Sequence, residues 1–196
     1  MSSGLMFYWL SWMFFVYVLF FMKYDKHQWF LMYWILIIMS TSNMYMTLTV
    51  LKFSIAYIVL FIGSIMFLLQ TNHRLFHFFS SFTLAIAYAS FLVWEHETPL
   101  LLFFPKYLVL PSFIVLIAIF LMNEFKNRCF VSLVGACGGE LLYHISLMAY
   151  TDDYTMGHDI FFDLCAIIIT FLTVIALYER MIDKLLMFFT RILQRP

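Results

Sequence analysis

The sequence predicts an all-α protein: a polytopic bundle of about seven transmembrane helices followed by an amphipathic helix at the membrane surface. Two observations lead to this prediction. Of the 196 residues, 65% are hydrophobic and 11% are charged, whereas soluble domains carry about a quarter charged residues. The apolar residues also form long runs, and the few charged residues lie between these runs. Because the chain lacks the polar residues that a water-facing surface needs, most of its surface is expected to face lipid.

A transmembrane helix needs about 17 to 25 mostly apolar residues, because each residue advances it by about 1.5 Å through a hydrocarbon layer about 30 Å thick. Seven runs fit this requirement. In chain order they are residues 5–22, 29–45, 53–70, 75–94, 100–122, 129–150 and 160–178. Residues 1–178 are therefore expected to form one seven-span transmembrane domain.

The second run needs polar residues to reach spanning length. It is strongly apolar only to Met39 and must continue through Ser40 toward Asn43. If it proves too short, residues 29–52 would form a re-entrant segment, and the orientation of every later helix would change.

The fifth run contains two prolines, Pro105 and Pro111. Each proline removes a backbone N–H donor from a helix. We therefore expect a kink, or an interrupted start near Lys106, in an otherwise spanning helix.

The distribution of Lys and Arg predicts the orientation, since the cytoplasmic side of a membrane protein holds the excess. With the N-terminus outside, only Lys52 and Lys106 lie on the outer side. The inner connections and the tail hold Lys23, Lys26, Arg74, Lys126, Arg128, Arg180, Lys184, Arg191 and Arg195. We therefore expect a multi-pass protein of the cell membrane with its C-terminus in the cytoplasm.

The last stretch, residues 179–196, has an amphipathic pattern. Apolar residues recur there at helical spacing, at Ile182, Leu185, Leu186, Phe189, Ile192 and Leu193. The opposite side carries Arg180, Lys184, Arg191 and Arg195. This pattern predicts a basic helix resting in the lipid headgroup layer; a helix that docks a partner is the alternative.

Three ionisable residues fall inside the predicted spans: Glu140, His144 and Asp163. Such residues are costly in lipid and usually face the interior of a bundle. His144 follows Glu140 by four residues and shares its helix face, and the antiparallel course of the last two spans places Asp163 in the same outer half. We expect the three to face one another.

Further polar residues could extend this cluster toward the outside: Tyr143, Tyr150, His158 and Asp159. Three interpretations remain open for the cluster. Glu140 can titrate and His144 relay a proton, or the two can hydrogen-bond and hold the last two spans together. A metal site is the third, although no H-E-x-x-H motif occurs in the chain.

Gly135 and Gly139 precede this cluster at a small-x-x-x-small spacing, which lets another helix approach closely. The adjacent Gly138 also permits a different interpretation. A glycine pair can loosen a helix at mid-membrane beside an acidic residue, as in the discontinuous helices of transporters.

Several residues of the chain occur in a characteristic order. They are Tyr8-Trp9 with Trp12, then Met22-Lys23, and above all the run Cys129-Phe-Val-Ser-Leu-Val-Gly135-Ala-Cys137-Gly-Gly-Glu140. In this order they resemble the YphA-type small polytopic membrane proteins of Bacillus-like bacteria. The resemblance covers nearly the whole chain and implies a location in the cytoplasmic membrane. It supplies no biochemical activity, because none is established for the family.

The sequence also limits the functions to consider. Eleven basic residues balance eleven acidic ones, so nothing favours nucleic acid as a partner. No phosphate-binding glycine motif and no G-x-S-x-G nucleophile turn occurs. We therefore expect no cofactor, no bound metal and no enzymatic activity.

The function that remains is the binding of lipid, a small ligand or another membrane protein. A proton-coupled carrier for a small solute that uses Glu140 is the alternative, and a membrane-embedded metal hydrolase is the third hypothesis. The sequence does not predict the oligomeric state.

Overall fold

The computed structural model describes residues 4–21, 26–48, 51–71, 74–97, 106–147 and 155–193. Within these ranges the chain forms seven helices and three short strands. The helices are α1 (Leu5–Phe21), α2 (Lys26–Thr41), α3 (Ile55–Leu69), α4 (Arg74–Glu97), α5 (Lys106–Leu121), α6 (Phe125–Leu147) and α7 (Asp159–Leu193). The strands are β1 (Tyr45–Leu48), β2 (Leu51–Ser54) and β3 (Thr155–Met156).

The helical fold class is confirmed, and each predicted apolar run overlaps one of the seven helices. Among the described residues, three helices are long and apolar enough to cross a membrane: α4, α6 and the part of α7 from Asp159 to Met187. The other four are apolar helices of 10–17 residues. Seven complete spans therefore remain a prediction.

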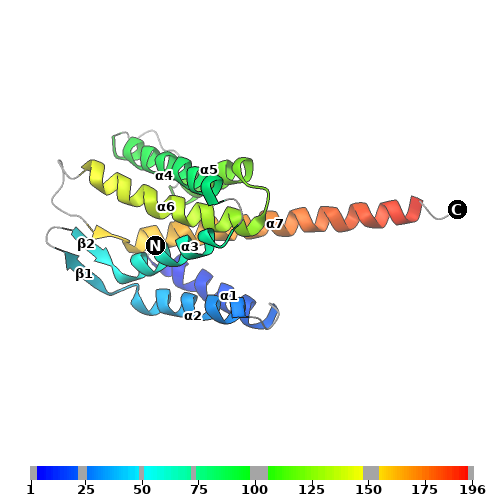
Figure 1. Ribbon diagram of the computed structural model, residues 1–196, viewed down its shortest axis with the longest axis horizontal. Coiled ribbons are helices and arrows are strands. Elements are labelled where there is room, and N and C mark those ends of the chain that lie inside the picture. Colours follow the sequence, from blue (N-terminus) through cyan, green and yellow to red (C-terminus); the bar gives the residue numbers. More distant parts are fainter. Residues whose placement is uncertain are drawn as a thin grey trace.

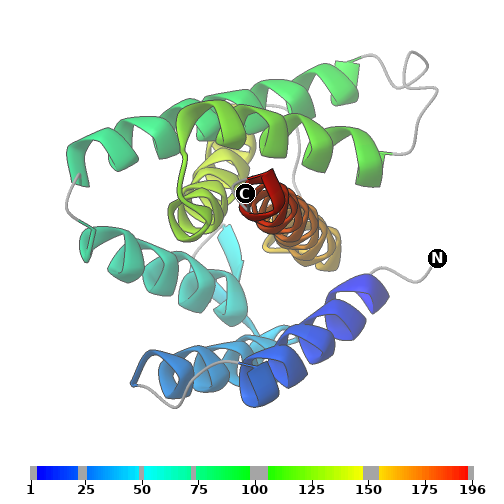
Figure 2. The same cartoon turned by 90° about the vertical axis from the view of Figure 1, so that its right-hand side faces the viewer.

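The helices pack around α6 and α7 (Figure 2). Figure 2 looks along α7 and shows α4 and α5 on one side of it and the α1–α2 pair on the other. The side chains at the centre are almost completely buried, and they include Leu84, Ile114, Ala118, Cys137 and Ile168. Large apolar side chains also cover much of the outside, such as Trp9 and Phe20 of α1, as expected for a surface that faces lipid.

A small sheet at one end of the bundle was not predicted (Figure 1). Strand β1 pairs antiparallel with β2, with Tyr45 opposite Ser54, and β2 pairs parallel with β3. The predicted extension of the second run to residue 45 is therefore wrong, since α2 ends at Thr41. Hydroxyl side chains at the end of α2 compete for backbone groups: the hydroxyl of Ser42 donates to the Met39 carbonyl at 3.1 Å.

The fifth helix begins late and is not broken by its proline. Helix α5 starts at Lys106, and it continues through the buried Pro111 to Leu121. Residues 100–105, which include Pro105, lie outside the described residues.

The last helix does not divide where the sequence analysis placed a boundary. Helix α7 runs from Asp159 to Leu193 without interruption, because no glycine or proline falls within it. A separate surface helix from residue 179 is thus not observed. Instead, the C-terminal part of α7 projects beyond the other helices as a straight rod (Figure 1).

Candidate functional site

The site begins with the close contact between α4 and α6. A Cβ atom added to Gly135 would lie 2.6 Å from Cβ of Leu84, and one added to Gly139 would lie 2.7 Å from Cβ of Tyr88. Such distances leave no room for a side chain, so the predicted close packing at these glycines is confirmed. Helix α6 continues through both glycines, and the alternative of a helix loosened there is therefore wrong.

This contact brings Tyr88 of α4 onto Glu140 of α6. The hydroxyl of Tyr88 donates a hydrogen bond to Oε2 of Glu140 at 3.1 Å. On the other oxygen, Nε2 of His144 lies 3.4 Å from Oε1. Tyr88 is 0% exposed and Glu140 is 7% exposed, so the carboxyl lies inside the bundle and both its oxygens have partners. The predicted pairing of Glu140 with His144 is confirmed.

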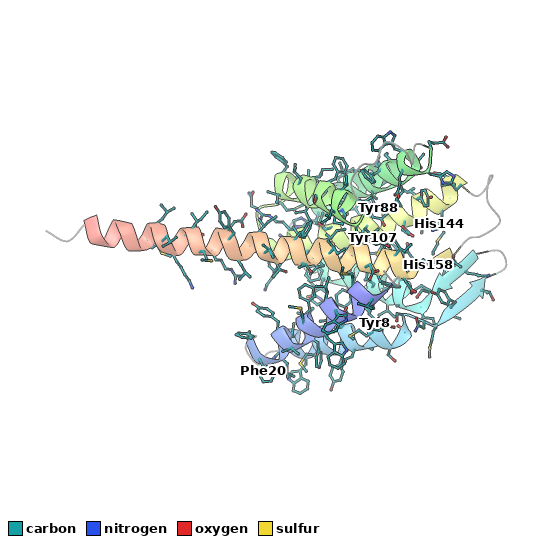
Figure 3. The ribbon with its side chains drawn as sticks, turned by 180° about the vertical axis from the view of Figure 1, so that it is seen from behind. Tyr8, Phe20, Tyr88, Tyr107, His144 and His158 are labelled. Carbon is teal, nitrogen blue, oxygen red and sulfur yellow. The ribbon has the colours of Figure 1, made fainter. Side chains whose placement is uncertain are left out.

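The cluster reaches toward the end of the bundle that carries the sheet (Figure 3). The side chain of His144 is 16% exposed, and its ring packs edge-on against Tyr143 with the ring centroids 5.4 Å apart. Polar groups therefore follow one another from the fully buried Tyr88 through Glu140 to the partly exposed His144. Tyr143 joins the cluster as predicted, whereas Tyr150 lies outside the described residues.

Two cysteines flank the cluster within the core. Cys137 of α6 and Cys165 of α7 are free and buried. The carbonyl of Cys137 accepts a hydrogen bond of 2.7 Å from the hydroxyl of Tyr57 on α3. Helix α3 is thereby also attached to α6, one turn before Glu140.

Asp163 does not belong to this cluster, and the prediction that it faces Glu140 and His144 is wrong. Its Oδ2 accepts a hydrogen bond from the backbone N–H of Gly4 at 2.9 Å, and its Oδ1 accepts one from the N–H of Phe7 at 2.6 Å. The first N–H groups of a helix lack partners within that helix and attract negative charge. Asp163, which is 2% exposed, therefore caps α1.

Asp159 lies with Asp163 beside the start of α1. A Cβ added to Gly4 would lie 3.3 Å from Cβ of Asp159. The pKa of Tyr45 is raised above its ordinary value, mainly by partial burial and secondly by the nearby carboxylate of Asp159. The side chain of His158 is exposed, and its carbonyl accepts a hydrogen bond from the N–H of Phe161. Asp159 is therefore placed beside the start of α1, and the extension of the Glu140 cluster by His158 and Asp159 stays a prediction.

The C-terminal end of α1 is also capped by a side chain from elsewhere. Nε2 of Gln28, on α2, donates to the carbonyl oxygens of Val18 and Leu19 at 2.8 and 3.3 Å. This role of Gln28 was not predicted, since a single Gln near the start of an apolar run gives no indication that it caps the end of another helix.

At the opposite end of the bundle two basic residues are buried, and one of them, Arg128, was predicted for the inner side. Nη1 of Arg128 lies 2.8 Å from Oε1 of Glu179 on α7, and its Nε donates to the Met122 carbonyl at 2.7 Å. His77 is buried as well, with Nδ1 3.2 Å from the sulfur of Met122. Arg128 thus ties α6 to the end of α5 and to α7.

The described residues offer no metal site. No three or more His, Cys, Asp or Glu side chains in these ranges lie close enough together to hold an ion. The metal-hydrolase hypothesis therefore has no ligand set in this part of the chain.

Comparison with known proteins gives one match. The model of the family described as "YphA-like integral membrane protein" matches residues 3–195. No curated protein and no solved structure matches the chain. Because the family model covers nearly the whole sequence, the resemblance found in the sequence is confirmed, and the chain belongs to the YphA-like integral membrane protein family.

Proposed function

We propose that this integral membrane protein is a non-enzymatic component of the cell membrane that binds lipid or another membrane protein. Its surface for that partner is the C-terminal part of α7, from Arg180 onward, which we name the α7 extension. In this proposal the protein is multi-pass, with its N-terminus outside and the extension in the cytoplasm.

Two contacts support this orientation. The hydrogen bonds that Asp163 accepts from α1 place the N-terminal ends of α1 and α7 side by side. This agrees with the proposal, because the first and seventh spans of a seven-span protein cross the membrane in the same direction. The pair between Arg128 and Glu179 lies at the other end, where the basic residues gather. Basic residues favour the cytoplasmic side.

The observation that carries the proposal is the exposed apolar surface of the α7 extension. Met181 is 64% exposed and Leu185 is 55% exposed. An apolar stripe on a helix that leaves its own bundle is typical of an interaction site. In the Glu140 cluster, by contrast, both carboxyl oxygens of Glu140 have partners within the protein.

A fluorescent label on the full-length protein tests this proposal. The three natural cysteines are changed to Ala, and a polarity-sensitive probe is attached at Leu185→Cys or, as the matched control, at Lys184→Cys. In lipid nanodiscs the probe at position 185 is expected to report an apolar environment and the probe at 184 to report water. Water around both probes, in neutral and in anionic lipid, would show that nothing covers the extension.

A second function, a proton-coupled carrier, is favoured by the path from His144 to Tyr88 through Glu140. Proton uptake into liposomes loaded with a pH-sensitive dye tests it. If Glu140 carries protons, both Glu140→Gln and Glu140→Leu abolish uptake while Glu140→Gln keeps the fold. Equal uptake by liposomes with and without the protein would exclude this function.

A further inference from the structure

Helices α4 and α6 run in the same direction along their shared interface. A Cβ added to Gly135 would meet Leu84 and the carbonyl of Ser81, and a Cβ added to Gly139 would meet Tyr88. The contact thus advances by four residues on both helices, from position 84 to 88 and from 135 to 139. Residues of the two helices can therefore be matched level by level.

Buried polar side chains occupy both halves of this interface. One half holds the Glu140 cluster. In the other half, Arg128 of α6 and His77 of α4 both contact Met122. Between these residues and the glycines lie Ser81 of α4, which is 2% exposed, and Ser132 of α6, which is 0% exposed. We name this second part the Arg128 half.

The hydroxyl of Ser132 has no hydrogen-bond partner among the described residues, although it is completely buried. Ser132 precedes Gly135 and Gly139 by three and seven residues, so it lies on the face of α6 that meets α4. The hydroxyl of Ser81 donates to the His77 carbonyl at 2.9 Å, and its oxygen can still accept a hydrogen bond. Because an unpaired buried hydroxyl is costly, a water molecule held by at least two polar groups commonly satisfies it.

Leu84 separates the two polar halves. It is 0% exposed and fills the space beside Gly135, where an added Cβ would lie 2.6 Å from Cβ of Leu84. On α4 it follows Ser81 by three residues and precedes Tyr88 by four, so the apolar gap is about 10 Å long. Helix α6 places only the glycine at this level, which has no side chain to bridge the gap.

We propose that the Arg128 half binds a water molecule between Ser132 and Ser81, and that Leu84 is the barrier to protons between this hydrated site and the Glu140 cluster. A proton passes between two groups that are in hydrogen-bond contact, either directly or through one water. An apolar gap of about 10 Å interrupts such contact. This inference goes beyond the proposed function. It also holds whether or not the unaltered protein moves protons.

Water-edited solid-state NMR of the unaltered protein in lipid bilayers tests the hydrated site. Ser64 of α3 is the matched control, because it is also 0% exposed and its hydroxyl donates to the Leu60 carbonyl at 2.7 Å. The signals of Ser132 are expected to build up from water at least threefold faster than those of Ser64. Equally slow build-up for the two serines would overturn the hydrated site.

Proton influx into liposomes that contain a pH-sensitive dye, driven by a potassium diffusion potential, tests the barrier. Leu84→Ser places a hydroxyl midway between the two polar halves and is expected to raise the influx at least tenfold over the unaltered protein. Leu172→Ser is the control, since it makes the same change at a buried position of α7 that is 1% exposed; its influx should equal that of the unaltered protein. Adding Glu140→Leu to Leu84→Ser should abolish the increase.

The outcomes distinguish this inference from the proposed functions. Equal influx for Leu84→Ser and Leu172→Ser, with helical content unchanged by circular dichroism, would overturn the barrier. If Leu84→Ser loses helical content, Leu84→Thr replaces it in the same comparison, because it keeps more of the side-chain volume. A leak in the Leu84 variant beside a tight unaltered protein would support the barrier while excluding the proton-coupled carrier. The binding role of the α7 extension depends on none of these results.

Discussion

Replacing Glu140 by Leu should destabilise the bundle chiefly through Tyr88. The Tyr88 hydroxyl is fully buried and has Glu140 as its acceptor, so the substitution leaves a buried donor without a partner. Such a loss costs about 1 to 3 kcal/mol. His144 adds little to this cost, because its side chain is partly exposed and can find water. The sequence predicted His144 as the partner of Glu140 and did not predict Tyr88.

Two further variants make this reasoning quantitative. Glu140→Gln keeps an oxygen that can accept from the Tyr88 hydroxyl, so a loss of less than about 1 kcal/mol is expected. Tyr88→Phe combined with Glu140→Leu removes both partners of the bond. This double variant should be more stable than Glu140→Leu alone by about 1 kcal/mol, since the unpaired donor is gone.

The free energy of unfolding can be measured for these three variants, for Tyr88→Phe and for the unaltered protein in mixed detergent micelles, with circular dichroism as the signal. A double-mutant cycle is formed by the unaltered protein, the two single variants Glu140→Leu and Tyr88→Phe, and the variant that carries both substitutions. Additive effects of the two substitutions would refute the assignment of the cost to the buried tyrosine. A Glu140→Leu protein as stable as the unaltered one would refute the structural role of the cluster altogether.

Three other predictions concern the supports of the bundle, and thermal unfolding in detergent checks each of them. Gly139→Ala should destabilise the bundle by about 1 to 3 kcal/mol, because the new Cβ would lie 2.8 Å from the Ala85 carbonyl oxygen. Gly138→Ala is the control, since its Cβ meets only the Ala85 side chain, at 3.2 Å. This control should be neutral or stabilising. Arg128→Leu should cost about 1 to 3 kcal/mol by leaving the Met122 carbonyl without its donor, whereas Leu at the exposed Lys126 should change nothing. Asp163→Ala should lower stability more than Asp163→Asn, which keeps one acceptor for the N-terminus of α1; equal losses would contradict the capping role.

Features that depend on a single helix could be predicted from the sequence. The positions of the helices follow from the length of the apolar runs. The contact between Glu140 and His144 follows from their separation by four residues on one helix. The close packing at Gly135 and Gly139 follows from the same kind of periodicity, although the sequence did not show that α4 is the partner.

Features that join distant segments could not be predicted in this way. From the order of the spans alone, Asp163 could face either α6 or α1. Only the packing of α7 against α1 shows that it caps α1. Nothing in the sequence distinguishes Tyr88 from the other aromatic residues of the apolar runs. It reaches Glu140 because the glycines of α6 allow α4 to approach closely. The sheet was missed because residues 43–54 are apolar enough to read as part of a span, although their Thr and Val content favours strands.

Helix α7 contacts three parts of the bundle that lie far apart in the sequence. Its first turns cap α1 through Asp163, its middle fills the core with Ile168, and Glu179 binds Arg128 where the helix leaves the bundle. Apolar residues continue along α7 onto the extension, where Met181 is 64% exposed and Leu185 is 55% exposed. A helix fixed at these points along its length holds the extension in one direction, so that less conformational freedom is lost when the extension binds the proposed partner. The burial that orients α7 inside the bundle therefore also prepares its exposed end for a partner.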